Sequence, residues 1–148
     1  MRLDLNGYNL IKGFEGLSLK PYLCSANVPT IGYGTTYYEN GTKVTMHDAV
    51  ITKERAFDLL KTNADRFATK VSNLVHKPIT QNQFNSLVSF AYNVGSGAFA
   101  SSTLLKKINV NPNDASIKYE FLKWNKAGGR VVNGLTTRRQ KEAELYFS

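Results

Sequence analysis

The hydrophobic pattern of the chain changes twice, and this limits the folds open to it. Residues 18–47 carry Thr, Tyr, Val and Ile among Gly, Pro and Asn, which favours short strands and turns, with Asn40-Gly41 as a hairpin turn. After Thr52, apolar residues recur at a period of 3.6, which predicts a helix of about six turns. A short helix is expected before Gly16, with Asn6 as its N-cap.

These patterns predict a single α+β domain over residues 1–148. A sheet lobe is expected over about 15–50 and a helical lobe over about 52–148. Four further helices are expected. The first begins at a capping box formed by Thr80 and Gln83 and ends at Gly95, and the second covers 103–108. The third runs from Asn111-Pro112 to near Trp124 and the fourth begins at Thr136 or Thr137, with a loop between Gly128-Gly129 and Asn133-Gly134.

Composition narrows the functional classes. The chain has 148 residues, of which 42% are hydrophobic, enough for one core without staples. Cys24 is the only cysteine, so the chain forms no intramolecular disulfide. A net charge of +8 attracts polyanions, but the basic residues are spread from Arg2 to Lys141 rather than gathered on one recognition element. We therefore expect no nucleic-acid partner.

Membrane, metal and cofactor signals are not found in the sequence. The N-terminal stretch is interrupted by Arg2, Asp4 and Lys12, and no segment approaches the ~20 apolar residues of a membrane span. His47 and His76 do not occur in a metal-ligand spacing, and there is no phosphate-binding loop. We expect a monomer without stable membrane insertion, metal or cofactor.

Glu15 is the residue that points most clearly to chemistry. A carboxyl group at the end of an apolar helix, beside a Gly-rich hairpin, is well placed to act as a general acid. We expect partial burial against Phe14 and Leu17 to keep it protonated. One reaction that needs such an acid is the cleavage of a glycosidic bond, which also needs a group on the face opposite the acid. Because residues 16–34 contain no carboxylate, Cys24 and Thr30 are the candidates for that group.

Four motifs resemble the bacteriophage lysozyme (endolysin) family, glycoside hydrolase family 24. They extend over nearly the whole chain and are Phe14-Glu15-Gly16, Thr30-Ile31-Gly32-Tyr33-Gly34, Phe90-Ala91-Tyr92-Asn93-Val94-Gly95 and Gly134-Leu135-Thr136-Thr137-Arg138-Arg139. The family pattern is a Glu, then Asp or Cys after eight intervening residues, then Thr after five more. Glu15, Cys24 and Thr30 fit it.

The resemblance implies a lysozyme-like fold and a hydrolase that cuts peptidoglycan glycan strands during lysis of the host cell. The bond would be the β-1,4 linkage from N-acetylmuramic acid to N-acetylglucosamine, with Glu15, Cys24 and Thr30 as catalytic residues. The enzyme would stay in the host cytoplasm until a separate phage pore protein opens the membrane. The expected sugar groove suggests Thr36, Tyr92, Ser102 and Arg130 as substrate-binding residues.

Cys24 departs from the Asp of the family's more familiar members, and two roles for it stay open. The thiol positions a water molecule together with Thr30, which we favour, or it attacks as a nucleophile. Two other functions are also considered: a cysteine-dependent peptidase or amidase of the wall peptide, and a non-catalytic basic wall-binding module. A peptidase would need Cys24 to pair with His47 or His76, and the sequence carries no local signature of such a pair.

Overall fold

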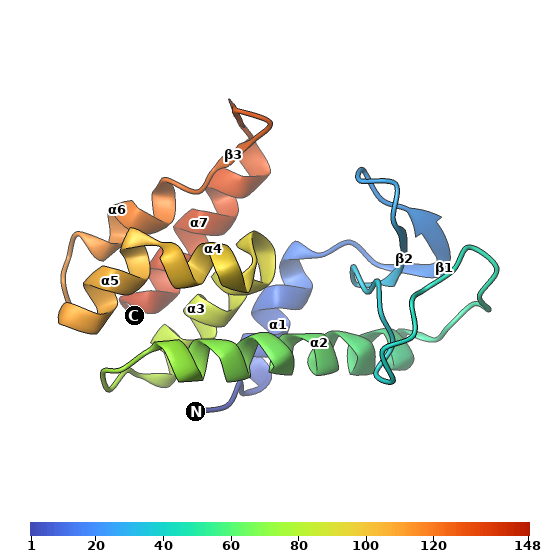
Figure 1. Cartoon of the computed structure of the whole chain (residues 1–148), viewed down its shortest axis with the longest axis horizontal. Coiled ribbons are helices and arrows are strands. Elements are labelled where there is room, and N and C mark those ends of the chain that lie inside the picture. The colour runs from blue at the N-terminus through green and yellow to red at the C-terminus, as the bar shows by residue number, and fades with distance from the viewer. The chain divides into compact units, whose positions relative to one another are not determined.

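Two helices, α1 (Leu5–Phe14) and α2 (Lys53–Leu74), belong in part to each of two units of the chain (Figure 1). The structure is a computed structural model that describes all 148 residues. The sheet unit is the segment Tyr8–Arg66, and the helical unit combines Met1–Gly7 with Phe67–Ser148. The expected long helix is confirmed, since α2 has 22 residues.

The sheet unit is built on one hairpin. Strands β1 (Ser18–Leu23) and β2 (Pro29–Gly32) pair antiparallel, with Tyr22 opposite Thr30 and a register irregularity between Ser18 and Tyr22. The turn expected at Asn40-Gly41 is present, because the Gly41 N–H donates to the Tyr38 carbonyl at 3.0 Å and Gly41 has a φ of 83°. The core of this unit includes Ile11, Ile31, Tyr33, Val44, Ala56, Leu59 and Leu60.

The helical unit surrounds α3 (Gln81–Val94), whose residues from Gln83 to Ala91 are all buried. The expected capping box is confirmed: the Gln83 N–H donates to the Thr80 hydroxyl oxygen at 3.1 Å, and the Thr80 N–H donates to Gln83 Oε1 at 2.9 Å. Gly95 ends the helix as expected. The other elements of the unit are α4 (Ser96–Ser101), α5 (Thr103–Val110), α6 (Ile117–Leu122), β3 (Lys126–Ala127), β4 (Arg130–Val131) and α7 (Asn133–Tyr146).

Aromatic rings form the centre of the helical core. The Phe90 ring meets Phe121 and Trp124 edge-on, each with a centroid separation of 5.6 Å. Phe90 also contacts Phe99, and the Arg139 guanidinium lies 4.9 Å from the Phe90 centroid. Edge-to-face packing of this kind contributes about 0.5–1.5 kcal/mol per pair beyond area burial. Phe90 therefore connects α4, α6 and α7 through a single side chain.

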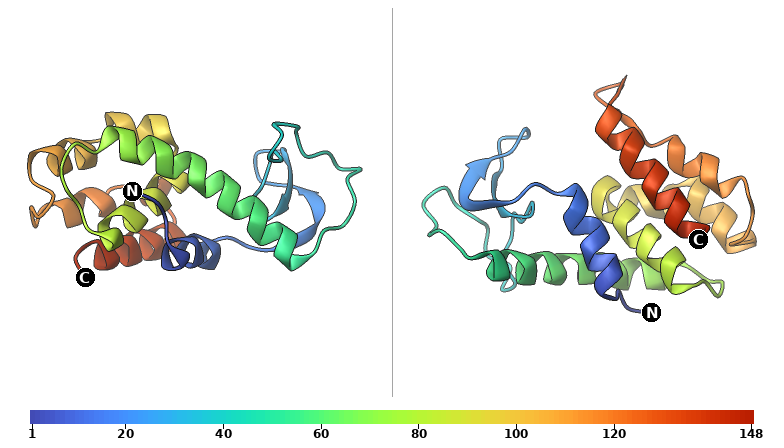
Figure 2. Two further views of the ribbon diagram at one scale, coloured as in Figure 1. Left: turned by 90° about the horizontal axis from the view of Figure 1, so that it is seen from below. Right: turned by 180° about the vertical axis from the view of Figure 1, so that it is seen from behind.

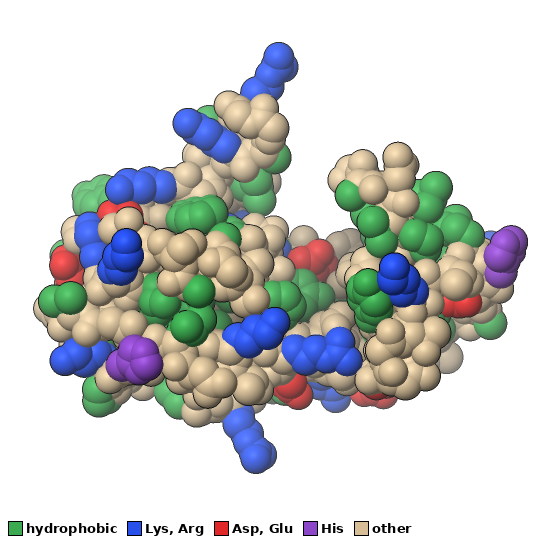
Figure 3. All heavy atoms as spheres, viewed as in Figure 1, with side chains coloured by type: hydrophobic (Ala, Val, Ile, Leu, Met, Phe, Trp, Pro, Cys, Tyr) green, Lys and Arg blue, Asp and Glu red, His purple; other side chains and the backbone are tan.

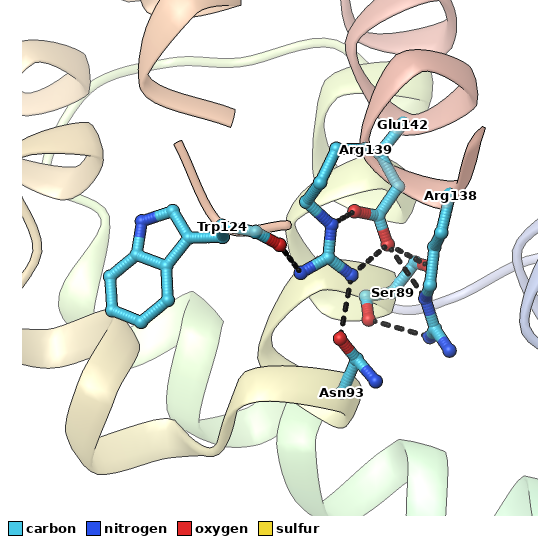
Figure 4. A network of polar contacts seen from close by, with 6 residues as sticks. All are labelled: Ser89, Asn93, Trp124, Arg138, Arg139 and Glu142. Carbon is cyan, nitrogen blue, oxygen red and sulfur yellow. Dashed lines mark hydrogen bonds and ion pairs between the residues drawn. The ribbon is translucent and has the colours of Figure 1, made fainter. Parts of the chain in front are cut away.

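A buried ion-pair network joins α3 to α7 (Figure 4). Glu142 is fully buried, and its Oε1 lies 2.7 Å from Arg139 Nε while its Oε2 lies 3.2 Å from Arg138 Nε. The Ser89 hydroxyl donates to Glu142 Oε2 at 2.5 Å. Desolvation raises the pKa of Glu142, and the two guanidinium groups oppose that rise. The carboxylate is thus held by three donors from two helices.

The network also reaches the segment before β3. Arg139 Nη2 donates to Asn93 Oδ1 at 2.9 Å, and Arg139 Nη1 donates to the Trp124 carbonyl at 3.5 Å. Arg138 Nη2 donates to the Ser89 carbonyl at 2.9 Å. Because buried charges are costly when unpaired, these bonds fix α7 against α3 and against the turn at Trp124.

The start of α1 differs from the expected one. The helix begins at Leu5, so Asn6 lies inside it rather than at its N-cap. Asp4 takes the capping role instead, since its Oδ1 accepts the Gly7 N–H at 3.0 Å. Asp4 is held there because the same oxygen accepts from Asn85 Nδ2 at 2.8 Å, a distant contact that the local sequence does not reveal.

The helix expected from Asn111-Pro112 is also shorter than predicted, because α6 begins only at Ile117. Asn111 ends α5 instead: its N–H donates to the Lys107 carbonyl at 2.9 Å. Its side-chain oxygen accepts the Asn113 N–H at 3.0 Å, a local turn that competes with helix initiation. The short helix α4 was not expected from the sequence.

The loop expected after Trp124 is a small hairpin. Lys126 pairs with Val131 and Ala127 pairs with Arg130, around a turn at Gly128-Gly129. Helix α7 then begins at Asn133, three residues before the earlier of the two expected starts. The Val132 N–H donates to the Asn125 carbonyl at 2.9 Å, which closes the hairpin and leads directly into the helix. None of the helices combines the length and the hydrophobicity that a membrane-spanning segment needs.

Replacing Glu142 with Gln should destabilise the protein by about 3 kcal/mol, because two buried guanidinium groups would lose their carboxylate partner. Urea unfolding at pH 7, followed by circular dichroism, measures this. Glu144→Gln is the matched control, since Glu144 is exposed on the same helix and should change stability by less than about 0.5 kcal/mol. Equal stabilities for the two variants would show that the network contributes nothing.

Candidate active site

Cys24 occupies the turn that joins β1 to β2. The turn is closed by two backbone hydrogen bonds, from the Asn27 N–H to the Cys24 carbonyl at 2.8 Å and from the Cys24 N–H to the Val28 carbonyl at 3.1 Å. Asn27 has a φ of 59°, a left-handed conformation that Asn adopts more readily than most residues. The turn curls around the half-buried Cys24 side chain.

This turn lowers the pKa of the Cys24 thiol. The main cause is a hydrogen bond from the Val28 backbone N–H to the sulfur, followed by one from the Ala26 N–H and a contact with the Thr30 hydroxyl. Donors aimed at sulfur stabilise the thiolate over the thiol. Three backbone amides, those of Val28, Ala26 and Cys24 itself, and the Thr30 hydroxyl are therefore the groups that lower the pKa of the thiol, and no imidazole is among these causes.

Thr30 is buried on β2 and has a defined hydroxyl partner. Thr30 is only 3% exposed, and its hydroxyl donates to the Val28 carbonyl at 2.8 Å. A hydroxyl carries one proton, so in this arrangement Thr30 has only lone pairs to offer to the thiol or to a water molecule. We therefore assign the stabilisation of the thiolate chiefly to the Val28 and Ala26 amides.

Glu15 follows the last residue of α1, and its carboxylate lies against a glycine. A Cβ atom added to Gly34 would be 3.4 Å from Glu15 Oε2. Gly34 has a φ of 83°, which strains any residue with a side chain. The turn around it is closed by two 2.9 Å hydrogen bonds between the backbones of Ile31 and Thr35. Glycine at position 34 thus lets the chain approach the carboxyl group closely.

The three predicted catalytic residues all belong to the sheet unit. Cys24 and Thr30 are in contact, and the Gly34 turn that touches Glu15 begins directly after Thr30 and Ile31. Glu15 is half-buried, while Leu17, which was expected to cover it, remains 38% exposed. The sequence marks Gly34 as a place for close backbone approach by a ligand, and the structure brings Glu15 there.

The four predicted substrate-binding residues have different surroundings. Thr36 lies half-buried in the sheet unit, and the Tyr92 ring lies 5.4 Å from the Phe67 ring in the helical unit. Ser102 is buried and caps α5, because its hydroxyl donates to the Phe99 carbonyl at 2.7 Å and accepts the Leu105 N–H at 3.1 Å. Arg130 is exposed on β4. The geometry of Ser102 favours a capping role, and sugar contact by the four stays a prediction.

A separate groove lies on the helical unit. It has a volume of about 680 Å³, and its lining residues include Leu122, Ala143 and Phe147. None of the predicted site residues lines it. The candidate site is therefore defined by its chemistry rather than by the size of a cavity.

The small antiparallel sheet that follows Glu15, together with a helical unit around one buried helix, defines an α+β protein of the lysozyme-like class. The chain belongs to the phage lysozyme family, whose sequence model matches residues 12–142. The match covers Glu15, Cys24 and Thr30, and it extends to Glu142 in the buried network.

Similar proteins include phage endolysins and one bacterial domain. An endolysin of Bacillus phage B103 is 45% identical over 148 residues, which is the whole of this chain but only 55% of that protein, so the chain spans about half the length of this relative. An endolysin structure from Escherichia coli O157:H7 phage FAHEc1 is 39% identical with a TM-score of 0.89, over 99% of this chain and 93% of that one. The muramidase domain of SpmX from Asticaccaulis excentricus is 32% identical with a TM-score of 0.86, over 99% and 98%.

Alkylation of Cys24 by iodoacetamide should reach half its maximal rate at a lower pH in the folded protein than in urea. The amides of Val28 and Ala26 stabilise the thiolate only when the turn is formed. In urea the midpoint should be that of an ordinary thiol, about 8.5. Mass spectrometry of timed samples gives both curves over about pH 6–10, a range that brackets the pKa of an ordinary thiol. The same midpoint in both states would contradict the proposed contacts.

Proposed function

We propose that this protein hydrolyses the β-1,4 bond between N-acetylmuramic acid and N-acetylglucosamine in peptidoglycan, as an endolysin of glycoside hydrolase family 24. The observation that carries the proposal is the placement of Glu15 against the Gly34 turn, in the same unit as the contacting Cys24 and Thr30. Endolysins that resemble the chain over its whole length support it, as does the likeness to a muramidase domain.

In the proposed reaction, Glu15 acts as the general acid. Its carboxyl group donates a proton to the glycosidic oxygen as the bond to the anomeric carbon breaks, so the leaving sugar departs with a hydroxyl group. The close backbone at Gly34 limits the rotation of the carboxyl group, which favours a fixed direction of proton delivery. This restriction matters because general acid catalysis needs the proton within hydrogen-bond reach of the leaving oxygen.

In this proposal, Cys24 and Thr30 hold the water molecule that attacks the anomeric carbon. The lone pairs of the Thr30 hydroxyl, whose proton goes to the Val28 carbonyl, accept a hydrogen bond from the attacking water. The sulfur acts as a thiolate, which a lowered pKa makes more populated, and it takes the second proton of the water as the oxygen bonds to the anomeric carbon. Attack by this water from the face opposite the leaving group would invert the anomeric carbon.

The surroundings of Cys24 argue against a peptidase. A cysteine peptidase activates its thiol with a nearby histidine, whereas the groups that lower the pKa of this thiol are backbone amides and a hydroxyl. The thiol is better equipped to hold water than to attack an amide.

The remaining parts of the proposal concern where and with what the protein acts. We propose that it acts as a monomer on glycan strands, with Thr36, Tyr92, Ser102 and Arg130 among the residues that contact sugars. Its net charge of +8 favours an anionic cell envelope. Release from the host cytoplasm through a membrane lesion completes the proposed lytic role.

Glu15→Gln should lower the rate of peptidoglycan hydrolysis at least about a hundredfold, because the amide cannot donate the proton. Glu54→Gln is the matched control, since Glu54 is an exposed carboxylate at the start of α2, and its rate should be unchanged.

Reduction and analysis of the released ends identifies the bond: N-acetylmuramic acid at the new reducing end is expected. New free amino groups instead would mean that the peptide is cut, and undiminished hydrolysis by Glu15→Gln would remove Glu15 from the chemistry.

Three replacements of Cys24 should separate its two roles. If the sulfur holds water, Cys24→Ser and Cys24→Asp should stay within about tenfold of the parent rate, while Cys24→Ala should lose about ten- to a hundredfold. Rates are measured on purified peptidoglycan, and intact mass spectrometry is run during turnover. A glycosyl adduct on Cys24, together with retention at the anomeric carbon, would establish the nucleophile instead. Full activity of Cys24→Ala would exclude both roles.

A further inference from the structure

The β3–β4 hairpin carries positive charge without compensation. From Phe121 to Lys141 the sequence contains no Asp or Glu. Every residue from 126 to 134 is exposed, and the hairpin projects from the helices α6 and α7 that it connects (Figures 1 and 2). Lys and Arg side chains, blue in Figure 3, extend from this projecting segment. Lys126 and Arg130 form no ion pair, whereas neighbouring Lys123 is held by Glu120 at 3.0 Å.

The register of the hairpin pairs each cation with an aliphatic side chain. Lys126 lies opposite Val131, and Ala127 lies opposite Arg130. Opposed residues point to the same face of a two-stranded ribbon, and successive residues point to opposite faces. One face therefore presents Lys126 beside Val131, which is 58% exposed, and the other presents Arg130 beside Ala127. Charge and apolar surface lie side by side on both faces.

The turn keeps these groups close together. Gly128 and Gly129 have φ values of 58° and 78°, as a tight two-residue turn with two left-handed residues requires. Both cations thus lie within two residues of the same turn. A ligand that meets the hairpin end-on encounters both charges and the aliphatic groups together.

We propose that the β3–β4 hairpin is a contact surface for acidic peptide, specifically the carboxylate-bearing peptide stems attached to the glycan strand. This inference rests on the proposed function, because it takes peptidoglycan to be the substrate. Arg and Lys recognise carboxylates, and Arg does so with a paired hydrogen-bond geometry. The adjacent Val131 and Ala127 match the methyl and methylene groups of a peptide. A phosphodiester polymer offers charge alone and leaves the aliphatic half of each face unused.

The expected effect is modest for one stem and depends on salt. Exposed ion pairs are worth about 0.2–1 kcal/mol each, so losing both cations should weaken binding about two- to thirtyfold. Because the charges are solvent-exposed, the difference should shrink as the ionic strength rises.

The experiment measures co-sedimentation of the Glu15→Gln protein with purified peptidoglycan from which phosphate polymers have been removed. Lys126→Gln/Arg130→Gln is compared with Lys77→Gln/Lys106→Gln, a control pair of exposed lysines in the same unit that removes the same charge. Lys126→Arg/Arg130→Lys keeps the charge. A second wall preparation has its carboxyl groups converted to neutral amides, and a third retains its phosphate polymers. Thermal unfolding confirms that all variants are folded.

We expect Lys126→Gln/Arg130→Gln to bind the phosphate-free peptidoglycan about fivefold more weakly than its parent, with the control pair changing less than about twofold. The charge-preserving pair should bind like the parent, and amidation of the wall should abolish the difference. Equal loss in the control pair, loss that persists on amidated walls, or loss confined to walls that retain phosphate would each overturn the proposal. Hydrolysis by Glu15→Gln is read separately, so failure of the hairpin contact is not confused with failure of the proposed reaction.

Discussion

One buried carboxylate organises the helical unit. Glu142 is enclosed between Arg138 and Arg139 and receives a third hydrogen bond from Ser89. An uncompensated charge in such a place is costly, so these partners must stay together for the unit to fold. Through Asn93 and the Trp124 carbonyl, Arg139 ties α7 to α3 and to the segment before β3. The base of the exposed hairpin is therefore anchored from the interior.

The sheet unit depends on backbone conformation instead. Gly34 permits the approach of Glu15, and the turn around Asn27 directs two amides at Cys24. Both devices use left-handed residues at the ends of a very short hairpin. The path of the backbone thus helps to set the positions of Glu15 and Cys24.

Local signals predicted the parts of the fold that local interactions determine. The capping box at Thr80, the stop at Gly95 and the periodicity of α2 were all readable, because their partners lie within one or two turns of the chain. Asn6 and Asn111 led to wrong predictions for two different reasons. Asp4 is fixed by the distant Asn85, and Asn111 satisfies a local turn in preference to a helix.

The catalytic residues were found through spacing and family likeness rather than through propensity. Thr30 alone looks like any β-branched strand residue, and only its place after Glu15 and Cys24 singles it out. The contact between Glu15 and Gly34 could not be predicted from the sequence, because it depends on how the backbone turns after Ile31. The hairpin at Gly128-Gly129 read as a loop because strands of two residues leave almost no periodic signal.

The helical unit is discontinuous in sequence, since its first seven residues are separated from the remainder by the sheet unit. Asp4 contacts Asn85, which lies 81 positions later in the chain. The contact therefore closes a long loop, and the chain loses conformational entropy when that loop closes. During synthesis the amino-terminal end leaves the ribosome well before α3 exists. Maturation of this half of the molecule must therefore wait for translation to pass Asn85, while the intervening segment has all of its own residues available earlier.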